Sequence, residues 1–187
     1  AMSTRSSESF DSIDGATELA YGWGATPVGP ALLAWDQRGI RSLTLAATDK
    51  QISLNHLAKM YPKVQLASSQ PQAVDLLEAC FAGEYPMPLL LEGTDFQCAV
   101  WRALMALSFG EVISYADLAK RLGRPRAARA VGNALAANRI GFLVPCHRVV
   151  QATGAIGRFR WGSQTKIDLL AWERESRSSQ TLADEHH

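Results

Sequence analysis

The fold of this chain is decided by the stretch GEVISYADLAKRLGRPRAARAVGNALAAN, residues 110–138. Ser114 is a favoured residue for capping the start of a helix, and the pattern after it predicts a helix over 115–122. The Gly-Arg-Pro triplet at 123–125 ends that helix, and a second helix is expected over 126–137. Two short helices joined by a tight turn predict a helix-turn-helix.

The second of these helices has almost no large side chains. Close packing against another helix would explain so many small residues, and so would close contact with a ligand. Arg126 and Arg129 lie three residues apart and should project from one side of the helix, where a purely packed helix has no use for two cations. The small residues beside them are Ala127, Ala128, Ala130 and Gly132.

The charge of the chain is uneven along its length. Residues 1–100 carry 6 Lys or Arg and 11 Asp or Glu, a net −5, whereas residues 101–174 carry 12 and 4, a net +8. This asymmetry indicates a polyanionic partner for the second half, although a solvated basic face would give the same pattern. A helix-turn-helix usually enters the major groove of DNA, but so thin a helix could also enter the minor groove, and spacing alone does not choose.

The segment VPCHRVV, residues 144–150, places a thiol beside an imidazole and a guanidinium. A nearby cation or base can lower the pKa of a cysteine and make it a nucleophile, and both His147 and Arg148 could act in this way on Cys146. In a regular strand the Cys146 and His147 side chains would face opposite ways, so their contact requires a turn or a bridging water. Glu173 is a candidate to orient His147 and fix its tautomer.

Two other interpretations of this segment stay open. A buried, inert cysteine beside a histidine with satisfied hydrogen bonds is the more common arrangement. A metal site would need a second pair of ligands at suitable spacing, which the sequence lacks, so we expect no metal. Tyr115 could be a core residue, a surface residue or a proton donor. Asn138 is of a residue type that often follows a helix.

Residues 17–90 are expected to form a small α/β domain. Short runs with β character over 18–48, with a turn at Asp36–Gly39, predict an antiparallel sheet. Apolar residues at helical spacing predict two amphipathic helices, over 54–60 and 73–81.

Residues 91–174 are expected to form a second, mostly helical domain. A Thr-x-x-Gln capping pattern predicts a helix over 94–107, and a final helix is expected over 163–172. The apolar side of that final helix would carry Ile167, Leu170 and Ala171. We expect 1–16 to be a disordered leader and 175–187 a flexible tail, because both are polar and rich in serine.

Composition excludes several classes of protein. The chain has 187 residues, 47% of them hydrophobic, and its longest apolar runs fall far short of the roughly 20 residues that span a membrane. Three cysteines without a CxxC pair or an export signal argue against a disulfide scaffold, so the cytoplasm is the expected location. We assign Cys80 and Cys98 to packing, because they lie on predicted amphipathic helices.

Residues 110–138 and 144–150, followed by GRFRWGSQTKIDLLAWE at 157–173, closely resemble the active domain of O6-alkylguanine-DNA alkyltransferases of the Ada/Ogt type. The resemblance covers about residues 94–174. Residues 17–90 match only in general layout, and the family has a ribonuclease H-like fold there. The resemblance implies a DNA repair protein that works by direct reversal and needs no cofactor.

In that family the cysteine of the PCHRV motif, here Cys146, removes a methyl or other alkyl group from O6 of guanine, and also from O4 of thymine. It keeps the group permanently as a thioether, so each molecule reacts once. The resemblance implies that His147 is linked to the thiol through a water and held by Glu173. Tyr115 would donate a hydrogen bond to N3 of the base, and Asn138 would be the hinge between the DNA-binding helix and the active-site loop.

The resemblance also implies how the base and the DNA are held. Backbone N–H groups near Arg160 would face O6, with Phe159 and Val149 in the same base pocket. The target base must leave the duplex, and Arg129 would fill the vacated space in the stack. The thin face laid into the minor groove would carry Arg126, Ala127, Ala128, Ala130 and Gly132. We expect a monomer in solution that could cluster on double-stranded DNA.

The chain departs from the pattern of the family it resembles in two respects. Phe159 stands where family members usually carry a tyrosine, which predicts a changed substrate preference. The zinc-binding cysteines of some relatives are absent, as is the four-cysteine module of the full adaptive-response regulators. Three rivals remain: a non-catalytic recogniser of alkylated DNA, a helix-turn-helix transcription regulator, and a cysteine hydrolase with turnover.

Overall fold

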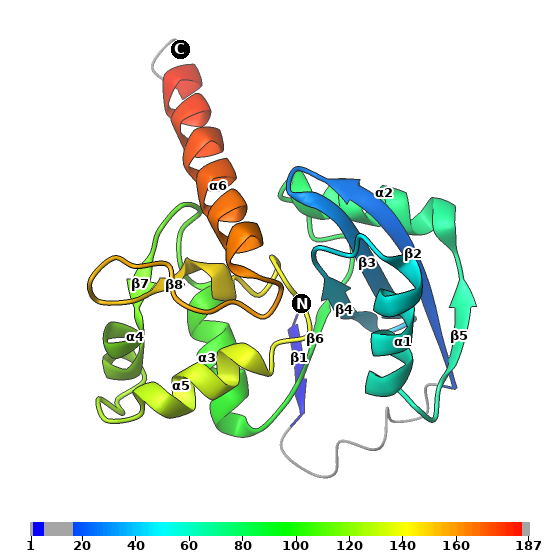
Figure 1. The fold of residues 1–187 in the computed structure, drawn as a ribbon, viewed down its shortest axis with the longest axis horizontal. Helices are drawn as coiled ribbons and strands as arrows, with labels where there is room; N and C mark the ends of the chain where they lie inside the picture. The colour runs from blue at the N-terminus through cyan, green and yellow to red at the C-terminus, as the bar shows by residue number, and fades with distance from the viewer. Residues whose placement is uncertain (1, 6–16, 185–187) are drawn as a thin grey trace.

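A six-stranded sheet lies on one side of the molecule and a group of helices on the other (Figure 1). The computed structural model describes residues 2–5 and 17–184, without the side chains of 2–5 and 180–184. The strands are β1 (Met2–Arg5), β2 (Glu18–Thr26), β3 (Gly29–Asp36), β4 (Gly39–Thr44), β5 (Gln65–Ser68), β6 (Leu89–Glu92), β7 (Ile113–Ser114) and β8 (Val149–Val150). The helices are α1 (Lys50–Met60), α2 (Gln70–Phe81), α3 (Asp95–Met105), α4 (Tyr115–Arg121), α5 (Ala128–Ala136), α6 (Ser163–Asp184) and the short 3-10 helix η1 (Cys146–Arg148).

The large sheet has the strand order β1-β6-β4-β3-β2-β5. β2, β3 and β4 pair antiparallel, which confirms the predicted sheet over 18–48. The predicted turn joins β3 to β4, where the Asp36 carboxylate accepts hydrogen bonds from the backbone N–H groups of Arg38 and Gly39 at 2.8 and 3.2 Å. β5 pairs parallel with β2, and β6 pairs parallel with both β4 and β1, so the complete sheet is mixed.

Successive side chains of β3 point to opposite faces of the sheet. Each face is covered by a different helix. Leu33 and Trp35 belong to the large core that continues through α2 into the helical side of the molecule. Leu32 and Ala34 belong to a smaller cluster under α1, together with Leu57. The predicted amphipathic helices are thus confirmed, one on each face.

The helical side is built around α3. Thr94 and Gln97 form the predicted capping box: the Thr94 hydroxyl accepts from the backbone of Gln97 and the Gln97 side chain accepts from the backbone of Thr94. Trp101 on α3 donates its indole N–H to the carbonyl of Ala134 on α5 at 2.9 Å. This hydrogen bond joins the buried face of α5 to the core, so the opposite face of α5 is turned outward.

Two predicted boundaries are wrong. The strand β1 (Met2–Arg5) lies within the expected disordered leader, where it extends the sheet beyond β6. The rest of that leader, 1 and 6–16, lies outside the described residues. The expected flexible tail from 175 is helical to Asp184, because no glycine or proline interrupts the helix-forming residues of α6.

The predicted helix over 126–137 begins later than expected. The N–H of Ala127 bonds to the carbonyl of Arg124 at 2.9 Å, which closes a turn, and α5 starts only at Ala128. Arg126 therefore lies in the turn and does not share a helical face with Arg129. None of the helices within the described ranges is long and apolar enough to cross a membrane.

α2 approaches β2 closely enough that no side chain fits between them at Gly22. A Cβ on this residue would lie 2.5 Å from the Cβ of Ala73. We expect Gly22→Ala to lower the free energy of unfolding by roughly 1–3 kcal/mol, because the helix must move away from the sheet. Urea denaturation measures the change.

The matched control is Gly132→Ala in the interior of α5, where an added Cβ meets no heavy atom within 4 Å. This substitution should raise the free energy of unfolding by up to about 1 kcal/mol, because alanine is the better helix former. Equal effects of the two substitutions would contradict the close packing of α2 on β2.

Candidate active site

The segment between α5 and β8 folds back on itself and places Cys146 at the start of η1. Asn138, just after α5, holds this turn together. Its amide nitrogen donates to the Cys146 sulfur and to the Val144 carbonyl, both at 3.1 Å, and its carbonyl oxygen accepts from the Ile140 N–H at 2.9 Å. These contacts place the residue expected to be a hinge directly against the thiol.

His147 and Arg148 both point toward Glu173 on α6. Nε2 of His147 lies 2.7 Å from Oε1 of Glu173, and Arg148 donates to both carboxylate oxygens at 2.9–3.3 Å. Arg148 also donates to the carbonyl of Leu107 at 3.1 Å. His147 and Glu173 are 0% exposed, so Glu173 is a buried carboxylate that ties the turn to the last helix.

The electrostatic setting of Cys146 differs from the expectation. Cys146 is 4% exposed, and burial raises the pKa of its thiol to about 12. The hydrogen bond from Asn138 and the charges of Lys166 and Arg160 oppose this effect only in part. His147 and Arg148 do not lower the pKa, because the 3-10 turn directs both toward Glu173.

Lys166 was not predicted from the sequence. It is 1% exposed, its ammonium donates to the Val149 carbonyl at 2.6 Å, and burial lowers its pKa to about 8. The predicted apolar side of the last helix is also wrong, because Ile167 is 43% exposed and Ala171 is exposed. The buried side of α6 carries Thr165, Lys166, Leu169 and Glu173. The sequence did contain a pattern that predicts this buried side, because Lys166, Leu169 and Glu173 are spaced at i, i+3 and i+7.

Cys146 opens onto a cavity of about 630 Å³ between α5 and the loop before α6. Tyr115, Phe159 and Arg160 line it as expected, and Arg160 donates to the carbonyl of Asn138 at 2.6 Å. Val149 is not among the lining residues, because it lies in β8 with its side chain fully buried. The lining also includes Gln151 and Arg158, which the sequence did not single out.

The outward face of α5 forms one wall of this cavity. Arg129 and Gly132 line it, together with Asn133 and Ala136, which were not predicted. Of the small residues expected on this helix, Ala128 and Ala130 are exposed and Gly132 is half-buried, while Ala127 is half-buried at the cap before the helix. Arg126 is exposed but does not reach the cavity lining, because it lies in the turn before the helix.

Cys80 and Cys98 are buried packing residues, as predicted. Burial raises the pKa of both thiols, that of Cys80 to about 11. Neither lines the cavity at Cys146. Within the part of the chain that the structure describes, no group of three or more His, Cys, Asp or Glu is arranged to hold a metal ion.

Comparison with known proteins shows the family of this chain. Residues 95–175 match the family described as 6-O-methylguanine DNA methyltransferase, DNA binding domain. The methylated-DNA–protein-cysteine methyltransferase of Methanosarcina acetivorans is 37% identical over 153 residues, which cover 79% of this chain and 94% of the relative. The chain belongs to the methylated-DNA–protein-cysteine methyltransferase family.

Other members of the methyltransferase family align over most of this chain. The Escherichia coli Ada protein, a bifunctional transcriptional activator and DNA repair enzyme, is 35% identical over 84% of this chain, which spans 46% of the length of Ada. A Mycobacterium tuberculosis OGT crystallised in complex with DNA superimposes with a TM-score of 0.66, at 35% identity, over 83% of this chain and 93% of its own. The O6-methylguanine-DNA methyltransferase of Pyrococcus kodakaraensis gives a TM-score of 0.60, at 30% identity, over 83% of this chain and 98% of its own.

Burial of His147 in this methyltransferase has a consequence for stability. Burial lowers its pKa from the ordinary 6.5, in spite of the neighbouring Glu173. Below that pH the unfolded chain binds a proton that the folded chain does not, so acidification favours unfolding. We expect the free energy of unfolding to fall from about pH 6.5 downward, by at most about 1.4 kcal/mol per pH unit for this group.

Urea denaturation from about pH 7.5 to about pH 5 measures this slope. His147→Gln should flatten it, whereas His56→Gln, at an exposed position on α1, should leave it unchanged. A slope that is the same in His147→Gln and the wild type would contradict the buried neutral imidazole.

Proposed function

We propose that this chain repairs DNA by moving a methyl or other alkyl group from O6 of guanine, or from O4 of thymine, to Cys146. One observation carries the proposal: the Cys146 sulfur faces a cavity large enough for a nucleobase, in contact with the Asn138 amide and next to a buried His147–Glu173 pair. Each molecule would react once, because a thioether has no route back to a thiol in this site.

The transfer is a displacement at the alkyl carbon. The bond from Cys146 sulfur to carbon forms while the bond from carbon to O6 breaks, and the guanine leaves with the electron pair. The thiol proton passes through a water to Nδ1 of His147, the ring nitrogen not engaged by Glu173. Tyr115, which lines the same cavity, supplies a proton to N3 of the departing base.

The high pKa of Cys146 suits a reagent that can be used only once. At a pKa of about 12 the thiol of the free protein is almost entirely protonated near neutral pH. A neutral thiol reacts slowly with oxidants and with small electrophiles. Transfer of the thiol proton to His147 would therefore accompany entry of the base. Until then the sulfur would react little with oxidants and small electrophiles.

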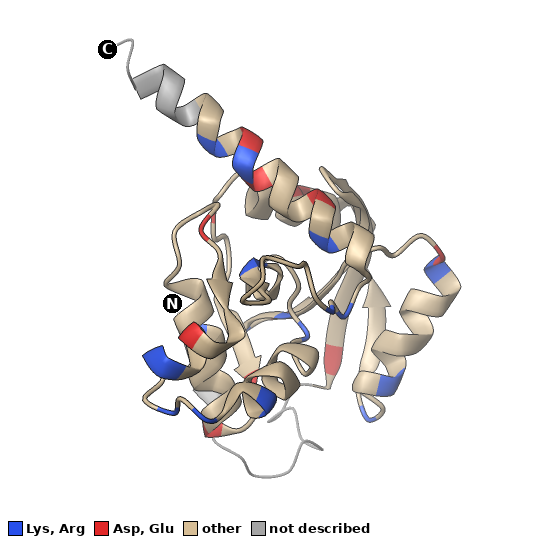
Figure 2. Ribbon diagram, turned by 60° about the vertical axis from the view of Figure 1, so that its left-hand side comes forward, with Lys and Arg blue, Asp and Glu red and all other residues tan. Residues whose placement is uncertain are grey.

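The proposed DNA-binding unit is the helix-turn-helix of α4 and α5. Figure 2 shows Lys and Arg along α4, the following turn and α5, and Lys120 and Arg121 are 67% and 56% exposed. The outward side of α5 is thin, since a Cβ at Gly132 would still meet open space. A thin helix that carries Arg129, with the cations of α4 and the turn beside it, fits a narrow minor groove flanked by phosphates.

We further propose that 17–90 and 91–174 act as two domains, a ribonuclease H-like support and a DNA-binding, alkyl-accepting domain. The division between the two domains falls inside β6, which pairs with β4 in the large sheet. The chain that follows β6 enters α3. The support is therefore tied to the second domain through one continuous strand.

A non-catalytic recogniser of alkylated DNA is the alternative, and the retained Cys146 argues against it. We expect the protein, mixed with an excess of an oligonucleotide containing O6-methylguanine, to gain one CH₂ on the Cys146 peptide. The yield should reach one methyl group per protein molecule and then stop. Mass spectrometry of the peptides and the DNA gives both quantities.

Cys98→Ser is the matched control, because it removes a buried thiol that does not line the cavity. It should react like the wild type, whereas Cys146→Ser should not react. DNA that keeps its methyl group with the wild type would support the recogniser, and many repaired lesions per molecule would support an enzyme with turnover.

Arg129 is expected to act in base extrusion, because it extends from α5 beside the cavity. Arg129→Ala should slow repair of a duplex at saturating protein by about 10-fold or more, yet leave attack on free O6-benzylguanine nearly unchanged. Single-turnover rates on the two substrates test this.

Arg126→Ala is the matched control, because it also removes one exposed positive charge, but from a residue outside the cavity lining. It should weaken duplex affinity and its salt dependence without changing the rate at saturation. Equal losses on duplex and free base for Arg129→Ala would refute the proposed role.

A further inference from the structure

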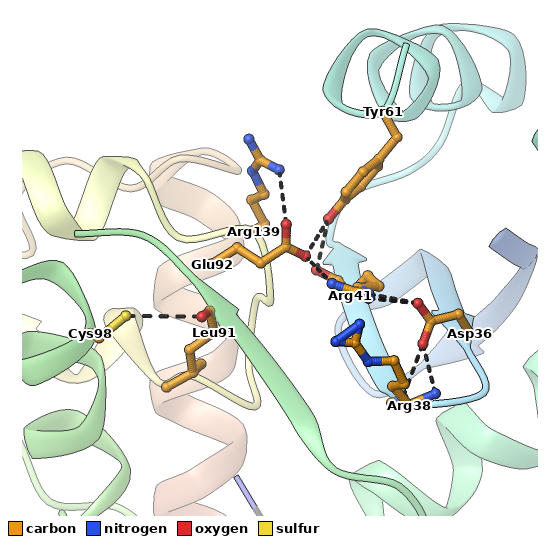
Figure 3. Close-up of polar contacts among 9 residues, drawn as sticks. Asp36, Arg38, Arg41, Tyr61, Leu91, Glu92, Cys98 and Arg139 are labelled. Carbon is orange, nitrogen blue, oxygen red and sulfur yellow. Dashed lines mark hydrogen bonds and ion pairs between the residues drawn. The ribbon is translucent and has the colours of Figure 1, made fainter. Parts of the chain in front are cut away.

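A partly buried network of charges lies between the large sheet and the segment that carries Asn138. We call it the Arg41 cluster; its members are Asp36, Arg41, Tyr61, Glu92 and Arg139. Figure 3 shows Glu92, at the end of β6, between Arg41 on the sheet side and Arg139 on the side of α5.

Arg41 is enclosed by two carboxylates. Its side chain is 2% exposed; Nε donates to Oδ2 of Asp36 at 2.8 Å, and Nη1 donates to Oε1 of Glu92 at 3.0 Å. Burial alone would lower the pKa of this arginine, but the two carboxylates outweigh that effect and raise it. Such a pair adds little net stability compared with apolar side chains, although it fixes geometry.

The second oxygen of Glu92 reaches the other side of the molecule. Oε2 lies 4.0 Å from Nη1 of Arg139, and the Arg139 guanidinium stacks 5.3 Å above the ring of Tyr61. The Tyr61 hydroxyl donates to the Arg41 carbonyl at 3.3 Å and lies 3.5 Å from Oε1 of Glu92. Glu92 thus joins a sheet strand, the end of α1 and the residue after Asn138.

The backbone reinforces this link. The N–H of Leu43 on β4 donates to the carbonyl of Arg139, and the N–H of Gly141 donates to the carbonyl of Leu43, both at 2.9 Å. Residues 139–141 therefore run along β4 as an added bridge of the sheet. Asn138, one residue earlier, holds the Cys146 sulfur, so the position of the sheet fixes the position of that amide.

We propose that Glu92 is a positioning residue for alkyl transfer, which holds Arg139 and thereby keeps the Asn138 amide against the Cys146 sulfur. This role rests on the proposed function. It assigns the N-terminal sheet a part in the reaction, although no residue of the sheet lines the cavity at Cys146.

The test compares Glu92→Gln, Arg139→Gln and the double variant with the wild type. Each protein reacts with free O6-benzylguanine, so that DNA contacts play no part, and mass spectrometry follows the Cys146 peptide. We expect each single variant to lower the maximal rate about three- to tenfold at an unchanged half-saturating concentration. The double variant should be no slower than either single one, because both substitutions break the same link.

Asp36→Asn is the matched control. It removes the other carboxylate of Arg41, on the side away from Arg139. It should lower the melting temperature but react at the wild-type rate, which separates positioning from general stability. If Glu92→Gln does not fold, Arg139→Gln carries the test. Arg139 lies in a loop and is partly exposed, so loss of its charge should disturb folding less.

Three results would overturn the proposal: an unchanged rate in the Glu92 and Arg139 variants, an equal slowing in Asp36→Asn, or losses that add in the double variant. An unreactive wild type would instead overturn the proposed function, and this role with it. The two failures are therefore distinguishable in one experiment.

Discussion

A carboxylate enclosed by protein needs partners for both oxygens, and Glu173 finds them in His147 and Arg148. This contact fixes the turn that carries Cys146, because His147 and Arg148, the two residues after it, cannot move without leaving a buried charge unpaired. It also explains why the two polar neighbours of Cys146 do not ionise the thiol. Their hydrogen bonds are already committed to α6, and the sulfur is left with Asn138.

Burial then sets the chemistry of the site. In the proposed reaction, a thiol with a pKa of about 12 stays protonated in the free protein and would become a nucleophile only when its proton has an acceptor and the substrate is in place. The lowered pKa of His147 keeps the imidazole neutral, which is the form that can take a proton. Lys166, with its pKa lowered to about 8, places a cation near the sulfur without a direct contact.

The sheet and the helical side of the molecule are joined where residues 139–141 run beside β4. Leu43 of β4 bonds to residues on both sides of Ile140, and the Arg41 cluster closes the same junction with side chains. Among the residues that the structure describes, the N-terminal sheet contributes none to the lining of the cavity at Cys146. The junction gives that sheet a mechanical connection to Asn138.

The sequence by itself determined the local elements and the reactive residue types. The capping box at Thr94, the turn at Asp36–Gly39 and the helices over the sheet follow from hydrogen bonding and hydrophobic spacing between residues close in the chain. Tertiary structure alone decided which side chains meet. The Arg41–Glu92 pair joins residues 51 positions apart in the chain, so no local pattern encodes it. The helical spacing of Lys166 and Glu173 placed them on one face of α6, but only the packed fold shows that this face is buried. The pKa of Cys146 likewise depends on enclosure by distant segments, which is why the sequence predicted a lowered value and the fold raises it.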